Sequence, residues 1–168
     1  MKKIKANFNI LFFYLVPFLA LTSCSGQKSN YSLDKKMTLI QDVKFIKWVT
    51  GKDFILWKPN QIDLNKVDEL LNEAINENKF YFLKTKKISE LRKSYRQYLC
   101  YINDKREKII YINSMCELFT DYDKDNNPIP FDWKNKMVDI SDGGKCYWNI
   151  KINITTTKYY ELKINGRS

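Results

Sequence analysis

The sequence predicts an α+β fold in which one main helix packs on a four-stranded, possibly five-stranded, antiparallel sheet. One strong amphipathic helix pattern occupies residues 64–78, and four segments of strand-like sequence follow it. The last two of these segments alternate apolar and polar residues, which is typical of strands with one buried and one solvent-exposed face. A helix followed by such strands favours an arrangement in which the helix covers the apolar face of the sheet.

The helix is expected over residues 64–78 because its apolar residues fall on one stripe. They are Leu64, Val67, Leu70, Leu71, Ala74 and Ile75. Asp63 is a suitable N-cap, and Asn78 can adopt the left-handed conformation that ends a helix. Upstream of the helix, residues 54–57 are predicted to form a short strand.

Four strands are predicted after the helix. The first two, at residues 95–103 and 108–113, flank a four-residue turn and form a hairpin. The third and fourth are expected at residues 145–154 and 158–165. Strict alternation predicts which side chains of these last two point inward. They are Cys146, Trp148, Ile150, Ile152 and Ile154 in the third strand, and Tyr160, Leu162 and Ile164 in the fourth.

The N-terminus has the pattern of a secretion signal. Three lysines among the first five residues precede an apolar stretch at residues 10–21, which is short for a membrane span. The segment Leu21-Thr22-Ser23-Cys24 resembles the lipobox of bacterial lipoproteins, whose cysteine is acylated before and after cleavage. The resemblance implies a signal peptide over residues 1–23 and lipidation of Cys24, for example by palmitate. An ordinary signal peptide ending in a chance cysteine, or an uncleaved anchor, is the alternative.

A lipid on Cys24 would place the mature protein at the bacterial cell envelope, with the outer membrane as the expected location. Two or three acyl chains make such attachment stable. Residues 24–36 are polar and are predicted to form a flexible tether. Residues 37–168 are then expected to form a single α+β domain, a length that suffices for one core.

Composition limits the chemistry of this domain. The chain has 29 Lys and Arg against 19 Asp and Glu, and three of the lysines precede residue 24, so the mature part keeps a net charge of +7. Aromatic residues make up 15% of the chain, which favours a folded domain. The chain has no histidine, which excludes Ser-His-Asp and Cys-His catalysis and His-ligated zinc. No cofactor is expected.

Three cysteines remain besides Cys24, in a compartment that oxidises thiols. Cys116 follows the second predicted strand, and Cys146 opens the third. If these strands are antiparallel neighbours, the end of one lies beside the start of the other, so we predict a Cys116–Cys146 disulfide. Cys100 is expected to be a small buried apolar residue. A nucleophilic Cys100 is the alternative, although no histidine could activate it.

Basic residues are concentrated in residues 84–108. They are Lys84, Lys86, Lys87, Arg92, Lys93, Arg96, Lys105, Arg106 and Lys108, against three acidic residues. If they form one face, that face would attract anionic lipid, acidic glycan or an acidic envelope protein. A solvated hairpin face is the alternative. Nucleic acid is not an expected partner of a secreted, tethered protein.

The acidic segment at residues 121–132 is a candidate calcium loop. Asp121, Asp123, Asp125 and Asp132 fall at positions 1, 3, 5 and 12 of an EF-hand-like pattern. However, Asn126 replaces the usual glycine, and two prolines occupy the second half of the segment. An exposed polar turn is the alternative.

Residues 95–103, 109–113 and 142–166 resemble segments of small lipoproteins of Bacteroidota-type bacteria, and the resemblance covers roughly residues 54–168. It implies no particular activity. The helix-then-sheet order also resembles the cystatin-like architecture, a roll that hosts inhibitors, binding modules and enzymes. Two function classes therefore stay open. The favoured one is a non-catalytic binding or interaction module, and the other is a small hydrolase-like enzyme that uses carboxylates in an α+β pocket.

Overall fold

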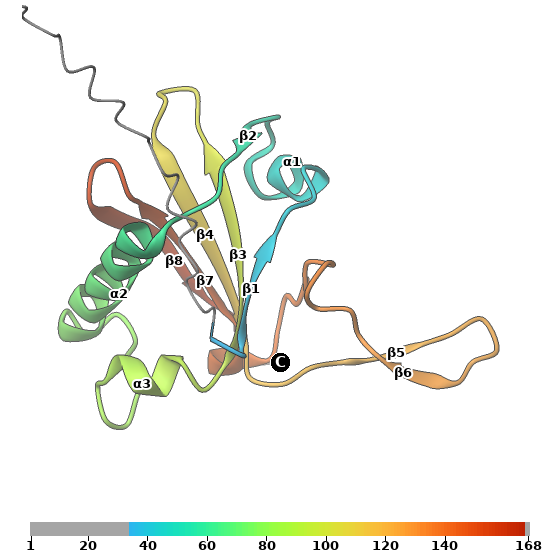
Figure 1. The fold of residues 1–168 in the computed structure, drawn as a ribbon. Coiled ribbons are helices and arrows are strands. Elements are labelled where there is room, and N and C mark those ends of the chain that lie inside the picture. The colour runs from blue at the N-terminus through green and yellow to red at the C-terminus, as the bar shows by residue number, and fades with distance from the viewer. Residues whose placement is uncertain (1–33, 167–168) are drawn as a thin grey trace, which may run out of the picture.

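The computed structural model describes residues 34–166, and these form a central sheet with helices on both faces (Figure 1). Within these residues the main sheet has six strands, namely β1 (Met37–Ile40), β2 (Ile55–Leu56), β3 (Tyr95–Ile102), β4 (Lys108–Met115), β7 (Trp148–Asn153) and β8 (Lys158–Ile164). The strand order is β1-β3-β4-β7-β8, and β2 also pairs with β3. The β1–β3 pair is parallel and the other pairs are antiparallel. The α+β class is confirmed, whereas this mixed sheet does not confirm four antiparallel strands or a cystatin-like roll.

The described part of the chain has three α-helices, α1 (Lys44–Thr50), α2 (Gln61–Asn76) and α3 (Ile88–Leu91). Helix α2 begins three residues earlier than predicted because Asn60, and not Asp63, is its N-cap. The side chain of Asn60 accepts the backbone N–H of Asp63 at 3.0 Å, and the Asp63 carboxylate accepts the N–H of Asn60 at 2.9 Å. This reciprocal capping box satisfies two backbone donors. Asn78 is left-handed, with φ of 60°, as predicted.

The main core lies between α2 and one face of the sheet. Its members on α2 are Val67, Leu70, Leu71, Ala74 and Ile75, and on the sheet they include Tyr98, Cys100, Ile110, Ile112, Trp148, Ile150 and Ile152. The predicted helix stripe and the inward residues of β7 therefore meet each other. Burial of these side chains supplies the main hydrophobic stabilisation of the fold.

The opposite face of the sheet is also covered, so the prediction of one solvent-exposed face is wrong. Leu99, Tyr101 and Ile109 are buried there together with Ile46 of α1 and Met137. Met137 belongs to the chain between β6 and β7, which packs back on the sheet. Strands β3 and β4 are buried on both faces, and this is why their sequences do not alternate between apolar and polar residues.

Strand β7 begins at Trp148, three residues later than predicted. Gly143 and Gly144 both have positive φ, 91° and 61°, and the chain makes a short 3-10 turn, η1 (Gly144–Cys146), before it extends. Glycine reaches this region without the penalty that a Cβ imposes. Cys146 therefore lies in η1 and not in the strand.

The alternation predicted for β8 is wrong in its first half because the strand contains an irregularity. Asn149 pairs with Lys163, whereas Lys151 pairs with Tyr160. Glu161 has φ of 50°, so the register shifts there. As a result Tyr159, instead of Tyr160, packs against the main core with Leu162 and Ile164.

Strands β5 (Thr120–Tyr122) and β6 (Pro128–Pro130) form a separate two-stranded hairpin. It projects away from the end of the sheet at which β4 ends (Figure 1). This hairpin contains most of the segment that was considered as a calcium loop.

Candidate functional site

The predicted signal peptide, the lipobox and Cys24 lie outside the described residues, so lipidation stays a prediction. Within residues 34–166, no helix is long and apolar enough to cross a membrane. Of the predicted tether, the structure describes only residues 34–36, which directly precede β1.

The predicted pair of Cys116 and Cys146 is present. The two residues lie at disulfide distance, with Cα atoms 5.1 Å apart. Strands β4 and β7 are antiparallel neighbours in which Ser114 pairs with Trp148, and continuing this register by two residues brings Cys116 opposite Cys146. The disulfide therefore joins the residue that follows β4 to the short segment that precedes β7.

Cys100 is a free buried cysteine, with 3% of its surface exposed, as the sequence predicts. Burial raises the pKa of its thiol well above the ordinary value. The thiolate is the nucleophilic form of cysteine, so a thiol that stays protonated is a poor nucleophile. The structure gives no support to a catalytic Cys100.

The four aspartates of the calcium prediction, Asp121, Asp123, Asp125 and Asp132, do not converge on one point. Asp123 accepts the backbone N–H groups of Asp125 and Asn127 and so closes the β5–β6 turn. Asp121 forms an ion pair with Lys136 at 3.6 Å. In residues 34–166, no group of three or more His, Cys, Asp or Glu side chains is arranged to hold a metal ion. The alternative of an exposed polar turn agrees with these contacts.

The structure divides the nine basic residues that were considered as one face. Lys84, Lys86, Lys87, Arg92 and Lys93 lie before and just after α3, whereas Lys105, Arg106 and Lys108 lie at the turn between β3 and β4. Eight residues of β3 separate the two groups by about 26 Å, and Figure 1 shows α3 and this turn at opposite ends of the strand. Arg96 is buried, with 3% of its surface exposed. One continuous basic face is therefore not formed.

Two hollows, together called here the groove, lie on the α2 side of the sheet beside the edge that β1 and β2 share. Its floor consists of Arg96, Tyr98 and Cys100, which alternate along β3 and so share a face. Strand β1 pairs with β3 as far as Leu99, and β2 pairs with it from Tyr101 onward. The two hollows have volumes of about 260 and 340 Å³, and Tyr98 lines both of them.

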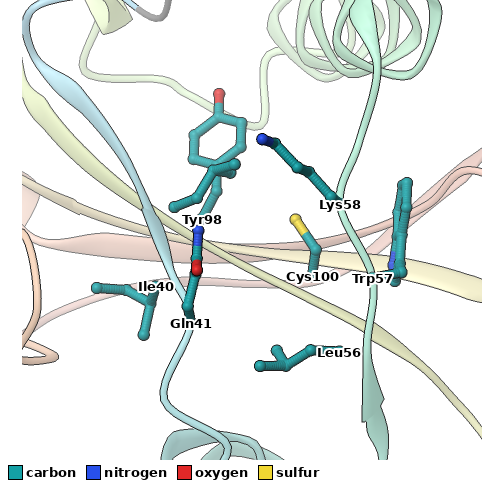
Figure 2. Close-up of a pocket in the computed structure, with 8 residues that line it drawn as sticks. Ile40, Gln41, Leu56, Trp57, Lys58, Tyr98 and Cys100 are labelled. Carbon is teal, nitrogen blue, oxygen red and sulfur yellow. The ribbon is translucent and has the colours of Figure 1, made fainter. Parts of the chain in front are cut away.

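The first hollow, called here the apolar hollow, lies around Cys100. It is lined by Leu39, Ile40, Gln41, Leu56, Trp57, Lys58, Tyr98 and Cys100. Figure 2 shows Ile40 and Gln41 on one side, Trp57 and Lys58 on the other, and Cys100 between them. The indole N–H of Trp57 donates to the carbonyl of Tyr101 at 3.1 Å, which fixes the ring at the wall. Most of the lining is apolar, as in many sites for small ligands.

The second hollow, called here the charged hollow, lies toward the start of β3. It is lined by Asp34, Met37, Gln61, Leu64, Asp68, Arg92, Arg96 and Tyr98. Its walls contain two ion pairs, Arg92 with Asp68 and Arg96 with Asp34, each at 2.6 Å. The Nε–H of Arg96 is buried and has no hydrogen-bond partner among the described residues. An unpaired buried donor costs about 1–3 kcal/mol.

The titratable groups of the groove suit binding better than proton transfer. Burial raises the pKa of Tyr98 to about 12, so its hydroxyl stays protonated at neutral pH. The backbone N–H of Lys36 and then the charge of Arg96 lower the pKa of Asp34, so its carboxylate stays ionised. A general acid or base needs a pKa near the working pH. Neither group has one.

Sequence reasoning missed this groove. The only signal was the alternation of Arg96, Tyr98 and Cys100 within a strand whose other face is equally buried. The sequence prediction grouped Arg96 with the other basic residues of 84–108, whereas an arginine is almost never fully buried unless it is paired. Its partner, Asp34, lies 62 residues away in the chain and could not be identified from local sequence.

Comparisons of the chain with protein-family models, with curated proteins and with solved structures find no match. The functional conclusion therefore rests on the groove, the charges and the predicted lipid anchor.

Proposed function

We propose that this chain is a lipid-anchored binding module of the bacterial cell envelope, held at the outer membrane through an acylated Cys24. In this proposal the groove beside the β1–β2 edge binds an amphiphilic molecule with an anionic head group. The protein would act by binding, without catalysis. The resemblance to small lipoproteins of Bacteroidota-type bacteria fits the anchor and adds no activity.

One observation carries the proposal: an apolar hollow adjoins a hollow whose walls include two arginines, Arg92 and Arg96. An anionic head group in the charged hollow would face the guanidinium groups of these two residues. The guanidinium of Arg92 is partly exposed and also pairs with Asp68 of the same hollow at 2.6 Å. The apolar part of the ligand would extend past Tyr98 toward Leu39 and Trp57, where its burial supplies affinity.

The alternative of a carboxylate-based hydrolase has less support. The charged hollow does contain two carboxylates, those of Asp34 and Asp68. Each is paired with an arginine at 2.6 Å, whereas glycosidase-type chemistry requires one carboxyl group with a raised pKa to act as the acid. The pKa of Asp34 is shifted in the opposite direction.

The proposal is tested by titrating the unlipidated chain from residue 25 onward with a fluorescent fatty acid. We expect saturable binding that weakens in Gln61→Glu, because this variant places a negative charge in the wall of the charged hollow. A repulsion of about 1 kcal/mol at partial exposure corresponds to roughly a fivefold higher Kd. Gln61 is the first residue of α2, where a carboxylate is favourable for helix stability.

Asn72→Glu is the matched control, since it adds the same charge to an exposed position of the same helix. The two positions are eleven residues apart, about 16 Å along the helix. The control should bind as the original chain does. Absence of saturable binding, or equal weakening in both variants, would contradict an anion-binding groove.

A further inference from the structure

We propose that four lysines around α3, Lys84, Lys86, Lys87 and Lys93, rest on anionic phospholipid headgroups of the membrane that holds the lipid anchor. These four residues are called the α3 basic surface. The inference rests on the proposed lipidation of Cys24, and it adds to the binding groove a defined orientation of the domain on the bilayer.

The four lysines are free to meet an external anion. All four are exposed, and none of the ion pairs formed among residues 34–166 includes any of them. Their positive charges therefore have no acidic side chain at ion-pair distance in the described part of the chain. Clustered lysines beside a membrane anchor are attracted to anionic lipid.

Glu90 is the acidic residue within α3, and it is engaged by the loop that carries the lysines. Its carboxylate accepts the backbone N–H groups of Lys84 and Thr85, at 2.9 and 2.8 Å, and the hydroxyl of Thr85. The hydrogen bond from the Thr85 hydroxyl, then those from the two backbone N–H groups, and to a smaller extent the charge of Lys93, lower the pKa of Glu90 to about 2. Lys86 has φ of 50° in the resulting turn. Glu90 thus orders the loop and leaves the lysine side chains directed to solvent.

The chain that leads to Cys24 leaves the domain at this same end. The Lys36 ammonium donates to the carbonyl of Lys93 at 2.6 Å, and the backbone N–H of Arg96 donates to the carbonyl of Lys36 at 2.8 Å. The Asp34–Arg96 ion pair adds a third attachment. The tether is therefore fastened beside the α3 basic surface.

If Cys24 is lipidated and the tether is flexible, as the sequence predicts, the length of the tether would keep this end close to the bilayer. Cys24 precedes Asp34 by ten residues, and a flexible chain of that length spans roughly 16–19 Å on average. The lysines at the β3–β4 turn lie about 26 Å farther along β3. An anchored domain therefore presents its α3 end to the headgroups most readily.

An aromatic residue adjoins the α3 basic surface. Tyr81 precedes Lys84 by three residues, and 68% of its surface is exposed. Tyrosine is enriched at the level of lipid headgroups, where its ring and its hydroxyl are both accommodated. Tyr81 supports a membrane as the partner, since a purely electrostatic partner would not require an exposed ring.

The test uses the full lipidated chain in nanodiscs, and an intact mass first establishes that Cys24 carries the lipid. One set of discs contains phosphatidylcholine alone, and the other adds phosphatidylglycerol. Acetylation of each lysine is followed by mass spectrometry. We expect the α3 basic surface to react about threefold more slowly in the anionic discs. Lys105 and Lys158, at the opposite end of the sheet, should react at the same rate in both.

Two variants with the same change of charge complete the design. Lys84→Glu/Lys86→Glu/Lys87→Glu should abolish the protection of Lys93, whereas Lys105→Glu/Arg106→Glu/Lys158→Glu should leave it intact. Equal labelling of the α3 basic surface in both discs, or protection of Lys105 instead, would overturn the inference. If the intact mass shows no lipid, the anchor proposal fails separately, and the same labelling on anionic vesicles still tests the lysines.

Discussion

Arg96 and Asp34 form an ion pair of 2.6 Å between side chains in very different surroundings. Only 3% of the Arg96 side chain is exposed, compared with 42% of the Asp34 side chain. The pair joins Asp34, the first described residue of the chain, to the second residue of β3, which lies in the floor of the groove. A charge that is buried on one side depends on its partner more than a surface charge does. Asp34 therefore contributes to both stability and the entrance of the groove.

Asp34→Asn is expected to destabilise the fold by about 1–2 kcal/mol, because the charge of Arg96 then lacks its counter-ion. The asparagine keeps an oxygen for the backbone N–H of Lys36, so the variant removes mainly the charge. Urea denaturation measures the difference. Asp53→Asn is the matched control, since Asp53 pairs with Lys47 where both side chains are well exposed. Its effect should be below about 0.5 kcal/mol.

The contribution of Asp34 should depend on pH in one direction. Its pKa in the folded chain lies below the ordinary value of 3.8, because the Lys36 N–H and then Arg96 favour the carboxylate. Stability from a carboxyl group of lowered pKa is complete above the unfolded pKa and is lost as the pH falls through the folded one. The difference in the free energy of unfolding between the original chain and Asp34→Asn should therefore be constant at neutral pH. It should shrink toward zero as the pH falls below 3.8. A gap that widens on acidification would contradict this assignment.

The Cys116–Cys146 disulfide is expected to stabilise the domain by about 3.5 kcal/mol through restriction of the unfolded chain. The two cysteines are 30 residues apart. Urea denaturation of the oxidised chain and of Cys116→Ser/Cys146→Ser measures the effect. A reductant should lower the midpoint of the original chain and leave that of the double variant unchanged. A midpoint insensitive to reductant in both chains would count against a bond between these residues.

The disulfide could be predicted from sequence because it depends on the antiparallel pairing of β4 with β7, which holds although β7 begins at Trp148 and not at residue 145. The hairpin of β3 and β4 and the apolar stripe of α2 were also predictable, since local periodicity encodes them. Strand β1 was not, because its four residues pair in parallel with a strand far along the chain. The shift in β8 was also hidden, since a non-glycine residue, Glu161, adopts a positive φ there.

Asn60→Ala is expected to reduce stability by about 1 kcal/mol, because it removes the side-chain oxygen that caps α2. The N–H of Asp63 then loses its acceptor. Thermal or urea denaturation measures the change. Asn65→Ala, at an exposed position one turn into the same helix, should change stability by less than about 0.5 kcal/mol. Equal effects at the two positions would show that the capping box contributes little.

The sequence predicts which basic residues are candidates for a site, but it does not predict where the fold places them. The sequence identifies the lysines of the α3 basic surface, and they are exposed as expected. It assigns Arg96 to the same group, although the pleat of β3 turns this residue inward beside Tyr98. It also offers no sign that residues 131–140 return to cover the second face of the sheet. The buried side-chain amide of Gln97 is one of the groups that bond to this segment.

Gln97 is fully buried and connects β3 to the segment that covers the second face. Its amide nitrogen donates to the carbonyls of Trp133 and Lys136, at 2.6 and 2.7 Å. Its amide oxygen accepts the backbone N–H of Val138 at 2.9 Å. Gln97→Met keeps a similar volume but leaves these three backbone groups unpaired. We expect a loss of about 2–4 kcal/mol, together with faster hydrogen exchange at the amide of Val138.

Two further variants separate the hydrogen bonds of Gln97 from its packing. Gln97→Glu retains the acceptor for Val138 and loses both donors, so exchange at Val138 should stay slower than in Gln97→Met, while stability falls because a carboxylate faces two carbonyls. Gln41→Met makes the same chemical change at an exposed position and should alter stability by less than about 0.5 kcal/mol. Unchanged protection of Val138 in Gln97→Met would mean that apolar contacts such as those of Met137 hold residues 131–140 without this amide.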